Sequence, residues 1–215
     1  NLLQSYAVAK NAYVAFLMGI NPSAAITCVK PSGTVSQLCD TASGIHARYA
    51  PFYLRRVRMD SKDPLALWLR DQGVPCEKDF YGENNLVFSF PQKAPKSVYR
   101  NDRTAIEQLE LWKIYQEDWC EHKPSVTIYI ADDEWDEVGA WVYKNLDSIS
   151  GVSFLPKEDG SHTYVQAPYE EITEEEYNKL VAEMPDIDFS TYKEVDDNTT
   201  ASQELACKGG ACEIV

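Results

Sequence analysis

The chain has 215 residues, 44% of them hydrophobic and 12% aromatic, which is enough to bury the core of one sizeable globular body. Its formal net charge of −14 argues against a DNA or RNA polymer as partner, because phosphate backbones select basic surfaces. Neither a membrane-spanning run nor a secretory signal is present, and the six mostly scattered cysteines are typical of a cytoplasmic protein with reduced thiols.

The chain opens at Asn1 inside a helical pattern of apolar residues, which the Gly19–Pro22 segment ends. Because the pattern is already under way at the first residue and no methionine precedes it, we expect a piece of a longer or split protein. Residues 26–29 then predict a short buried strand, which breaks at Pro31 and leads into a second helix.

A polar turn joins this strand to this helix. It comprises Pro31, Ser32, Gly33, Thr34 and Val35. Gly33 permits a close backbone approach, and the N–H groups at a helix start, with the hydroxyls of Ser32, Thr34 and Ser36, favour an anion such as a nucleotide phosphate. Taken alone, so short a pattern favours an ordinary capped strand–helix turn, since established phosphate signatures are longer.

Four further strands follow in the chain. We expect them at residues 52–59, with one bulge or shift, 85–90, stopped by Pro91, 125–130 and 151–155, and a fifth at 163–166. The three arginines at 55, 56 and 58 are expected on a solvated side. Strands and helices alternate four or five times, which predicts an α/β arrangement with a largely parallel sheet.

The helices between these strands carry clear end signals. We expect one helix at 65–72, with Asp63 as its N-cap and Gly73 at its end, and a second at 106–119, with its tryptophans in the core. Asp132 is expected to cap a third helix, which has Trp135, Val138, Val142 and Leu146 on one face. A capping box of Thr173 and Glu176 is expected to begin a fourth. After Pro185 the chain turns polar and acidic, which predicts a linker or surface wrap followed by a flexible tail.

Two thiols, Cys207 and Cys212, are separated by four residues near the end of the chain, and two of these four are glycines. This spacing permits a disulfide. A zinc site is a weaker alternative, because zinc normally takes four ligands and the sequence has no second close pair of Cys or His residues. The third alternative is that the two cysteines are inert. If about fifteen preceding residues are flexible, the pair could range over roughly 20 Å. The remaining cysteines, at 28, 39, 76 and 120, are expected to be buried small hydrophobes.

The segments around both motifs resemble the C-terminal part of adenosylcobalamin-dependent (class II) ribonucleotide reductases, of the ribonucleoside-triphosphate reductase type. The resemblance is carried by CVKPSGTVSQL, SGIHARYAPFYLRRVRM, SVTIYI, DEWDEVGAWVYKN, GVSFLP and CKGGAC, in the family's order and over nearly the whole chain.

The resemblance implies a fold and a set of roles. Residues 1–192 would be the last part of a ten-stranded α/β barrel with cobalamin-facing segments, and residues 193–215 a flexible redox tail. Residues Pro31–Val35 would hold the phosphates of a ribonucleoside triphosphate, and Cys207 and Cys212 would reduce the active-site disulfide and be re-reduced by a thioredoxin-type protein. His46 is expected to be an ordinary hydrogen-bonding residue and not a cobalt ligand.

The family's radical-bearing cysteine and reducible active-site pair match no segment of this chain. The resemblance therefore implies that adenosylcobalamin chemistry requires the missing N-terminal part of the reductase as a partner. The competing hypothesis is a stand-alone, non-catalytic thiol-redox or nucleotide-binding module that acts on another chain.

Overall fold

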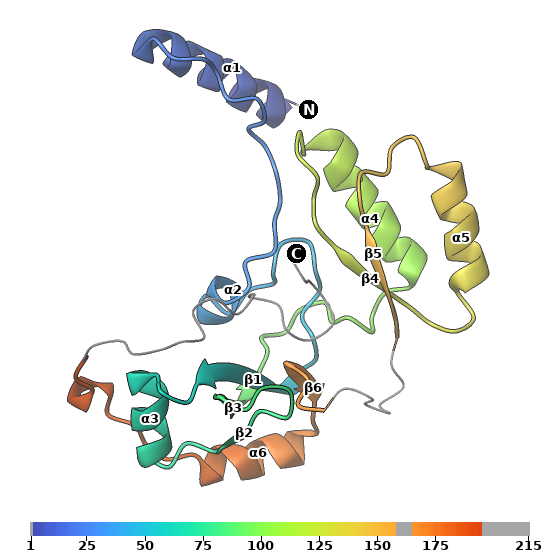
Figure 1. Ribbon diagram of the computed structural model, residues 1–215. Helices are drawn as coiled ribbons and strands as arrows, with labels where there is room; N and C mark the ends of the chain where they lie inside the picture. The colour runs from blue at the N-terminus through green and yellow to red at the C-terminus, as the bar shows by residue number, and fades with distance from the viewer. Residues whose placement is uncertain (1, 158–164, 195–215) are drawn as a thin grey trace. The chain divides into compact units, whose positions relative to one another are not determined.

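The computed structural model describes residues 2–157 and 165–194, so Cys207 and Cys212 lie outside the described residues. The chain divides into two compact units, whose elements Figure 1 labels. Unit 1 comprises Asn1–Arg48 and Pro95–Asp159, and unit 2 comprises Tyr49–Ala94 and Gly160–Val215. None of the helices in the described ranges has the length and apolar character needed to cross a membrane.

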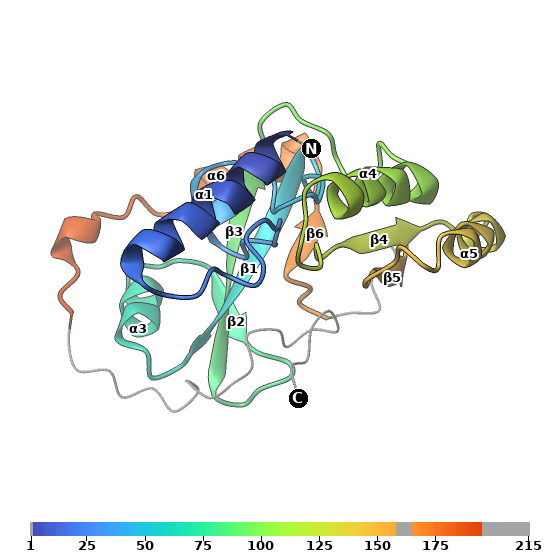
Figure 2. The same cartoon turned by 90° about the horizontal axis from the view of Figure 1, so that it is seen from above.

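Unit 1 is built on a short pair of parallel strands. β4 (Thr127–Ile130) and β5 (Ser153–Pro156) pair along their whole length, with α5 (Trp135–Lys144) between them in the chain. α4 (Ala105–Asp118) packs along β4, as Figure 2 shows. The buried core comprises Ala105, Leu109, Trp112, Ile128, Ile130, Val138 and Trp141. Both strands occur where the sequence predicts them.

The predicted helix at 106–119 is confirmed as α4. Thr104 begins it with a capping box, since its hydroxyl accepts from the N–H of Glu107 while the Glu107 carboxylate accepts from the N–H of Thr104. Leu109 and Trp112 are fully buried, and the Trp112 indole donates to the carbonyl oxygen of Pro124 at 3.1 Å. Of the two tryptophans that the periodicity places in the core, Trp112 is buried and also satisfies a buried backbone acceptor, whereas Trp119 is half-buried.

The start of α5 differs from the prediction. Glu134, not Asp132, is the N-cap residue, and its carboxylate accepts from the backbone N–H groups of Ala131 and Ala105, both at 2.9 Å. The expected apolar face is correct for Val138, which is buried, and for Val142, which packs partly buried against the core, but it is wrong at its two ends. Trp135 and Leu146 are exposed, and Leu146 lies beyond the end of the helix at Lys144, whereas Trp141 is buried in the same core cluster as Val138.

The first helix, α1 (Leu2–Met18), is confirmed, with Gly19 at φ +67° ending it. Ala15 is its buried residue in the described structure. Its large apolar side chains are exposed, and the most exposed are Leu2, Leu3, Tyr6, Phe16, Leu17 and Met18.

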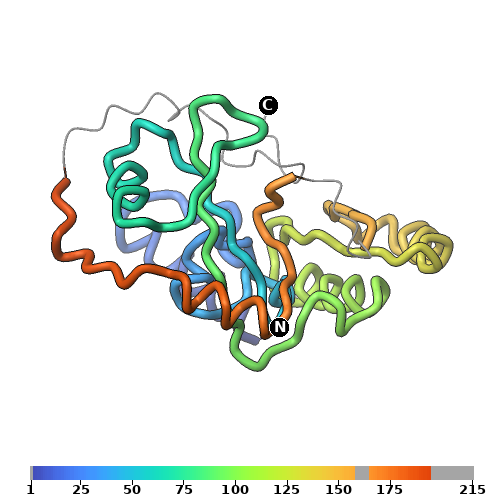
Figure 3. Tube along the Cα trace, turned by 90° about the horizontal axis from the view of Figure 1, so that it is seen from below, coloured from blue at the N-terminus to red at the C-terminus, as the bar shows by residue number. Residues whose placement is uncertain are grey.

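Unit 2 contains a four-stranded antiparallel sheet. The strand order is β2 (Cys76–Lys78), β3 (Asn85–Lys93), β1 (Phe52–Asp60) and β6 (Tyr169–Glu171). α3 (Pro64–Asp71) and α6 (Glu174–Glu183) accompany it, and Figure 3 follows the chain through α6 to the 3₁₀ turn η1 (Phe189–Thr191). The core comprises Ala66, Leu69, Val74 and Phe88.

The prediction of a largely parallel sheet is wrong for this larger sheet. β1 and β3 pair antiparallel over nine residues although α3 lies between them, so the helix and the short strand β2 return the chain beside β1 without a parallel crossover. Parallel pairing occurs between β4 and β5. The part of the prediction that is confirmed is a mixed α/β structure.

Three details of the strands also differ. The expected bulge in β1 is absent, because Phe52 to Asp60 pair one-to-one with Lys93 to Asn85. β3 continues through Pro91, which is tolerated because β2 pairs only with residues 86–88 and no strand on that side needs a proline N–H. Residues 165 and 166, expected in a strand, form a turn, and the strand near them is β6.

The predicted caps of unit 2 are confirmed. The Asp63 carboxylate accepts from the N–H of Leu65 at 2.8 Å with Pro64 at the first helical position, and Gly73 follows α3 at φ +84°. Thr173 and Glu176 form the capping box of α6. Beyond α6, the rings of Phe189 and Tyr192 both contact the indole of Trp68, which ties the end of the described chain to α3.

Candidate functional site

The candidate site begins with the extended segment that leads to the polar turn. The predicted strand at 26–29 is wrong, because these residues are extended but pair with no strand. Their partner is the segment after α4: the carbonyl oxygen of Thr27 accepts from the N–H of Glu121 at 2.9 Å. Lys30 donates through its ammonium group to the carbonyl oxygen of Lys123 at 2.6 Å.

A single carboxylate satisfies the backbone of this segment. Glu121 Oε2 accepts from the N–H of Ile26 at 2.8 Å and from the N–H and hydroxyl of Thr27 at 3.2 and 3.3 Å. These hydrogen bonds, first from Ile26 and then from Thr27, lower the pKa of Glu121. The side chain therefore replaces the ladder that a neighbouring strand would provide.

Acid is expected to loosen this attachment. A carboxylate with a lowered pKa contributes stability that is fully present above its unfolded pKa and is lost as the pH falls through the folded value. Amide hydrogen exchange at Ile26 and Thr27, corrected for its intrinsic pH dependence, should accelerate over that range relative to the core amide of Ile128. Glu121→Gln should remove this pH dependence, and an unchanged pH profile in that variant would contradict the assignment.

The turn itself is held by two serine hydroxyls. Ser32 donates its N–H to the Ser43 hydroxyl at 2.9 Å, and the Ser32 hydroxyl accepts from the N–H of Ser36 at 3.1 Å. Gly33 has φ +59° with open space where a Cβ would stand. Gly44, at φ +62°, packs so closely on the backbone that a Cβ there would lie 3.1 Å from the carbonyl oxygen of Lys30. The predicted helix follows as α2 (Val35–Leu38) and has four residues.

The tip of the turn presents unused donors. The backbone N–H groups of Gly33, Thr34 and Val35 have no hydrogen-bond partner among the described residues, and all three residues are exposed. The Ser36 hydroxyl is also without a partner although Ser36 is only 2% exposed. Consecutive exposed amides beside a buried hydroxyl form a nest-like arrangement suited to an anion.

His46 follows the turn and has an ordinary structural role, as predicted. Its Nδ1 donates to the carbonyl oxygen of Ser43 at 2.9 Å, and its Nε2 accepts from the N–H of Thr127 at 3.0 Å. Because Nε2 is the acceptor in this pair of bonds, the donor proton is assigned to Nδ1. Since both nitrogens are engaged, His46 links the loop after the turn to β4 and has no nitrogen left for cobalt.

The expected burial of the four scattered cysteines holds in part. Cys120 is buried, and Cys28 and Cys76 are half-buried. Cys39, the residue after the end of α2 at Leu38, is exposed. Within residues 2–157 and 165–194, no group of three or more His, Cys, Asp or Glu side chains is placed to hold a metal ion.

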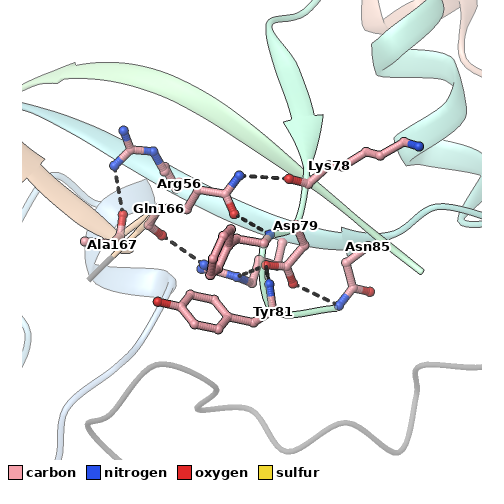
Figure 4. Close-up of polar contacts among 9 residues, drawn as sticks. Arg56, Lys78, Asp79, Tyr81, Asn85, Gln166 and Ala167 are labelled. Carbon is pink, nitrogen blue, oxygen red and sulfur yellow. Dashed lines mark hydrogen bonds and ion pairs between the residues drawn. The ribbon is translucent and has the colours of Figure 1, made fainter. Parts of the chain in front are cut away.

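Unit 2 contains a polar network that sequence reasoning missed (Figure 4). The buried carboxylate of Asp79 accepts from Arg58 Nε and from Asn85 Nδ2, both at 3.3 Å. Gln166, at φ +57°, donates to the carbonyl oxygen of Lys78 at 2.8 Å and accepts from the N–H of Phe80 at 2.9 Å. The β2–β3 connection is thereby fixed to the chain before β6.

The three arginines of β1 were expected to line a solvated side of the sheet, and this prediction is wrong. Arg58 donates to the carbonyl oxygen of Gln166 at 2.9 Å, Arg56 donates to that of Ala167 at 3.1 Å and pairs with Glu170, and Arg55 lies 4.5 Å over the ring of Tyr169. They are half-buried because the chain before and within β6 covers them. Only the positions of residues more than a hundred apart reveal this.

Comparison with known proteins decides the relationship. No family model matches the chain. The adenosylcobalamin-dependent ribonucleoside-triphosphate reductases of Lactobacillus acidophilus and Lactobacillus leichmannii are each 32% identical to it over 92% of its length, and a probable enzyme of that name from Dictyostelium discoideum is 31% identical over 88%. The crystal structure of a B12-dependent (class II) ribonucleotide reductase matches 86% of the chain with a TM-score of 0.71 and 31% identity.

This chain is a homologue of the class II ribonucleotide reductases. The sequence resemblance is thereby confirmed, and so is the ribonucleoside-triphosphate reductase type of its relatives. The chain spans about a quarter of the length of these relatives, 27% in L. acidophilus and 28% in L. leichmannii, and 26% of the solved structure. Because 92% of the chain is matched, its polar turn, His46 and α4 all lie in the matched portion.

Proposed function

We propose that this chain is the part of a class II ribonucleotide reductase that supplies a substrate-phosphate turn and a terminal thiol shuttle. The whole enzyme would reduce ribonucleoside triphosphates to 2′-deoxyribonucleotides. The observation that carries the proposal is homology over 92% of the chain to reductases of that name, together with the fold match. The missing N-terminal part of the reductase would complete the active site.

The phosphate-binding residues in this proposal are Pro31, Ser32, Gly33, Thr34 and Val35. The free amides of Gly33, Thr34 and Val35 supply donors that point to no other group among the described residues. The Thr34 hydroxyl is exposed, and the Ser32 hydroxyl accepts from Ser36 and retains its own proton to donate. Amide and hydroxyl donors recognise an anion without a fixed cation, which suits a chain with a net charge of −14.

Adenosylcobalamin is the cofactor that this proposal assigns to the whole reductase, since its relatives are named for it. When bound, it would start the radical reaction by homolysis of its cobalt–carbon bond. The chemistry of the described residues does not supply a cobalt ligand at His46, where both ring nitrogens are hydrogen-bonded within the fold. The part of this chain is therefore substrate positioning and electron delivery.

Cys207 and Cys212 would deliver the electrons. We propose that they reduce the active-site disulfide by thiol–disulfide exchange and are re-reduced by a thioredoxin-type protein. The base of the tail is attached, because Phe189 and Tyr192 hold it to Trp68 with ring centroids 5.5 and 5.4 Å apart. A flexible tether from Glu194 to Cys207 would span about 20 Å on average and roughly 45 Å at full extension.

The wider assignment follows from the same homology. We propose that residues 1–192 contribute the last part of a ten-stranded α/β barrel and that residues 193–215 are its flexible redox tail. The reductase would act in the cytoplasm, where thioredoxin-type proteins keep thiols reduced. Neither a nucleic acid polymer nor a membrane is required.

The role of the turn can be tested with two separate glycine-to-glutamate substitutions, one in the turn and one at a control glycine that also has positive φ. Gly33→Glu is expected to weaken ribonucleoside triphosphate binding by roughly tenfold or more, because the added carboxylate would repel the phosphates. Gly19→Glu is the matched control, since Gly19 also has positive φ, +67°, and open space at its Cβ position. Isothermal titration of the full-length reductase carrying each change measures the effect. Equal affinity in both variants would remove the turn from the site.

A further inference from the structure

Two cysteines that the proposed function does not use lie against each other in unit 1. Cys28 is on the extended segment before the polar turn, and Cys120 follows α4. The Cys28 thiol and the backbone N–H of Val29 both lie near enough to the Cys120 thiol to affect its pKa. Cys28 Sγ lies 3.3 Å from the carbonyl oxygen of His122, two residues beyond Cys120.

The contact is built by the backbone around it. Immediately before Cys28, Thr27 is bonded through its carbonyl oxygen to the N–H of Glu121, and the Glu121 carboxylate holds the N–H groups of Ile26 and Thr27. After Cys28, the Lys30 ammonium group donates a hydrogen bond to the carbonyl oxygen of Lys123. Hydrogen bonds on both sides of Cys28 therefore attach its segment to the residues that follow Cys120 and keep the two cysteines close, which shortens the search that disulfide formation otherwise requires.

The two thiols differ in accessibility. Cys28 is half-buried, whereas Cys120 is 7% exposed, and burial is the main cause that raises the pKa of the Cys120 thiol. A small oxidant would thus meet Cys28 first, and Cys120 would be positioned as the second, resolving thiol.

We propose that Cys28 and Cys120 are a second dithiol pair, which peroxides oxidise to a reversible disulfide. The Cys28 thiolate attacks one peroxide oxygen, the O–O bond breaks, and a sulfenic acid and water result once the leaving oxygen is protonated. The Cys120 sulfur then attacks the sulfenic sulfur, the S–O bond breaks, and a second water leaves. Two thiols and hydrogen peroxide thus give one disulfide and two waters, and a dithiol reverses the reaction by two exchange steps.

The bond would act on the candidate site through the chain. Cys28 precedes Pro31 by three residues, so the disulfide would fasten the segment that carries the turn to the end of α4. This pair is distinct from Cys207 and Cys212, and its formation does not depend on the proposed function.

The test is chemical mapping in the full-length protein. Cys207→Ser with Cys212→Ser is used as background, so that the tail cannot reduce the pair. After treatment with hydrogen peroxide in the presence of dimedone, which traps sulfenic acids, mass spectrometry should find the linked Cys28–Cys120 peptide. In Cys120→Ser and in Cys120→Ala, dimedone labelling of Cys28 should rise at least about tenfold, because the resolving thiol is gone.

The remaining variants make the result specific. Cys28→Ser should leave Cys120 as a free thiol, and Cys39→Ser, which removes a nearby exposed cysteine, should leave the linkage unchanged. If Cys120 stays free in the oxidised background protein, or if labelling of Cys28 is the same with and without Cys120, the pair is not a disulfide site. None of these measurements depends on nucleotide binding or turnover. A negative result would therefore contradict the Cys28–Cys120 disulfide without contradicting the proposed function.

Discussion

Replacing both tail cysteines, Cys207→Ser with Cys212→Ser, is expected to lower turnover of the full-length reductase with a thioredoxin-type reductant by roughly a hundredfold or more. A protein reductant is too large to reach a buried disulfide, so electrons would have to pass through thiols that visit both surfaces. A small dithiol can enter the active site itself, and turnover with it should stay within about twofold of the unmodified enzyme.

The comparison of reductants carries the test. Cys39→Ser is the control, since it removes an exposed cysteine with no proposed role and should leave both rates unchanged. Loss of turnover with both reductants would mean that the pair acts in the reaction itself or in folding. Full turnover with the thioredoxin-type protein would remove the tail from the electron path.

Helix ends were predicted well from the sequence because their causes lie within one turn of chain. Asp63 with Pro64 starts α3, and Thr173 with Glu176 starts α6, where the predicted bonds are present. The prediction of Asp132 as N-cap was wrong because Glu134, two residues later, takes that position and accepts from two N–H groups, one of them on Ala105. That second donor is 29 residues away, and no local pattern reveals it.

Strand pairing was predicted poorly because partners are chosen across the fold. The alternation of strands and helices suggested parallel crossovers, yet β1 and β3 pair antiparallel with α3 between them. Residues 26–29 have the apolar character of a strand, but Glu121 and the backbone beside it satisfy their hydrogen bonds, so no strand forms. Strand propensity describes fit to a pleated surface and does not specify the neighbour.

For the candidate site, the residues of the turn were predictable but their setting was not. Gly33 and the hydroxyls marked the turn, whereas its fastening to Ser43 and the close approach of Gly44 depend on the loop that follows. The Asp79–Gln166 network is similar, since its members lie up to 108 residues apart. Single charged or amide residues give no sign of such partners in a sequence.

Trp112→Ala is expected to destabilise unit 1 by about 3–5 kcal/mol, the cost of emptying a buried tryptophan site. Trp112 is fully buried against the strands of the β4–β5 pair, and its removal also leaves the carbonyl oxygen of Pro124 without its indole donor. Hydrogen exchange of the β4 amides in the full-length protein measures the effect, because it reports the opening of this unit separately from global unfolding.

Two further variants separate the contributions to this loss of stability. Trp112→Phe keeps an aromatic ring but not the N–H, and should cost about 1–3 kcal/mol through the unpaired carbonyl. Ile114→Ala, on the same helix but 56% exposed, should cost less than about 1 kcal/mol. Because β4 also holds His46 through the N–H of Thr127, faster exchange in Trp112→Ala should extend to the loop after the polar turn. If β4 opens faster while that loop does not, the turn is supported independently of the α4 core.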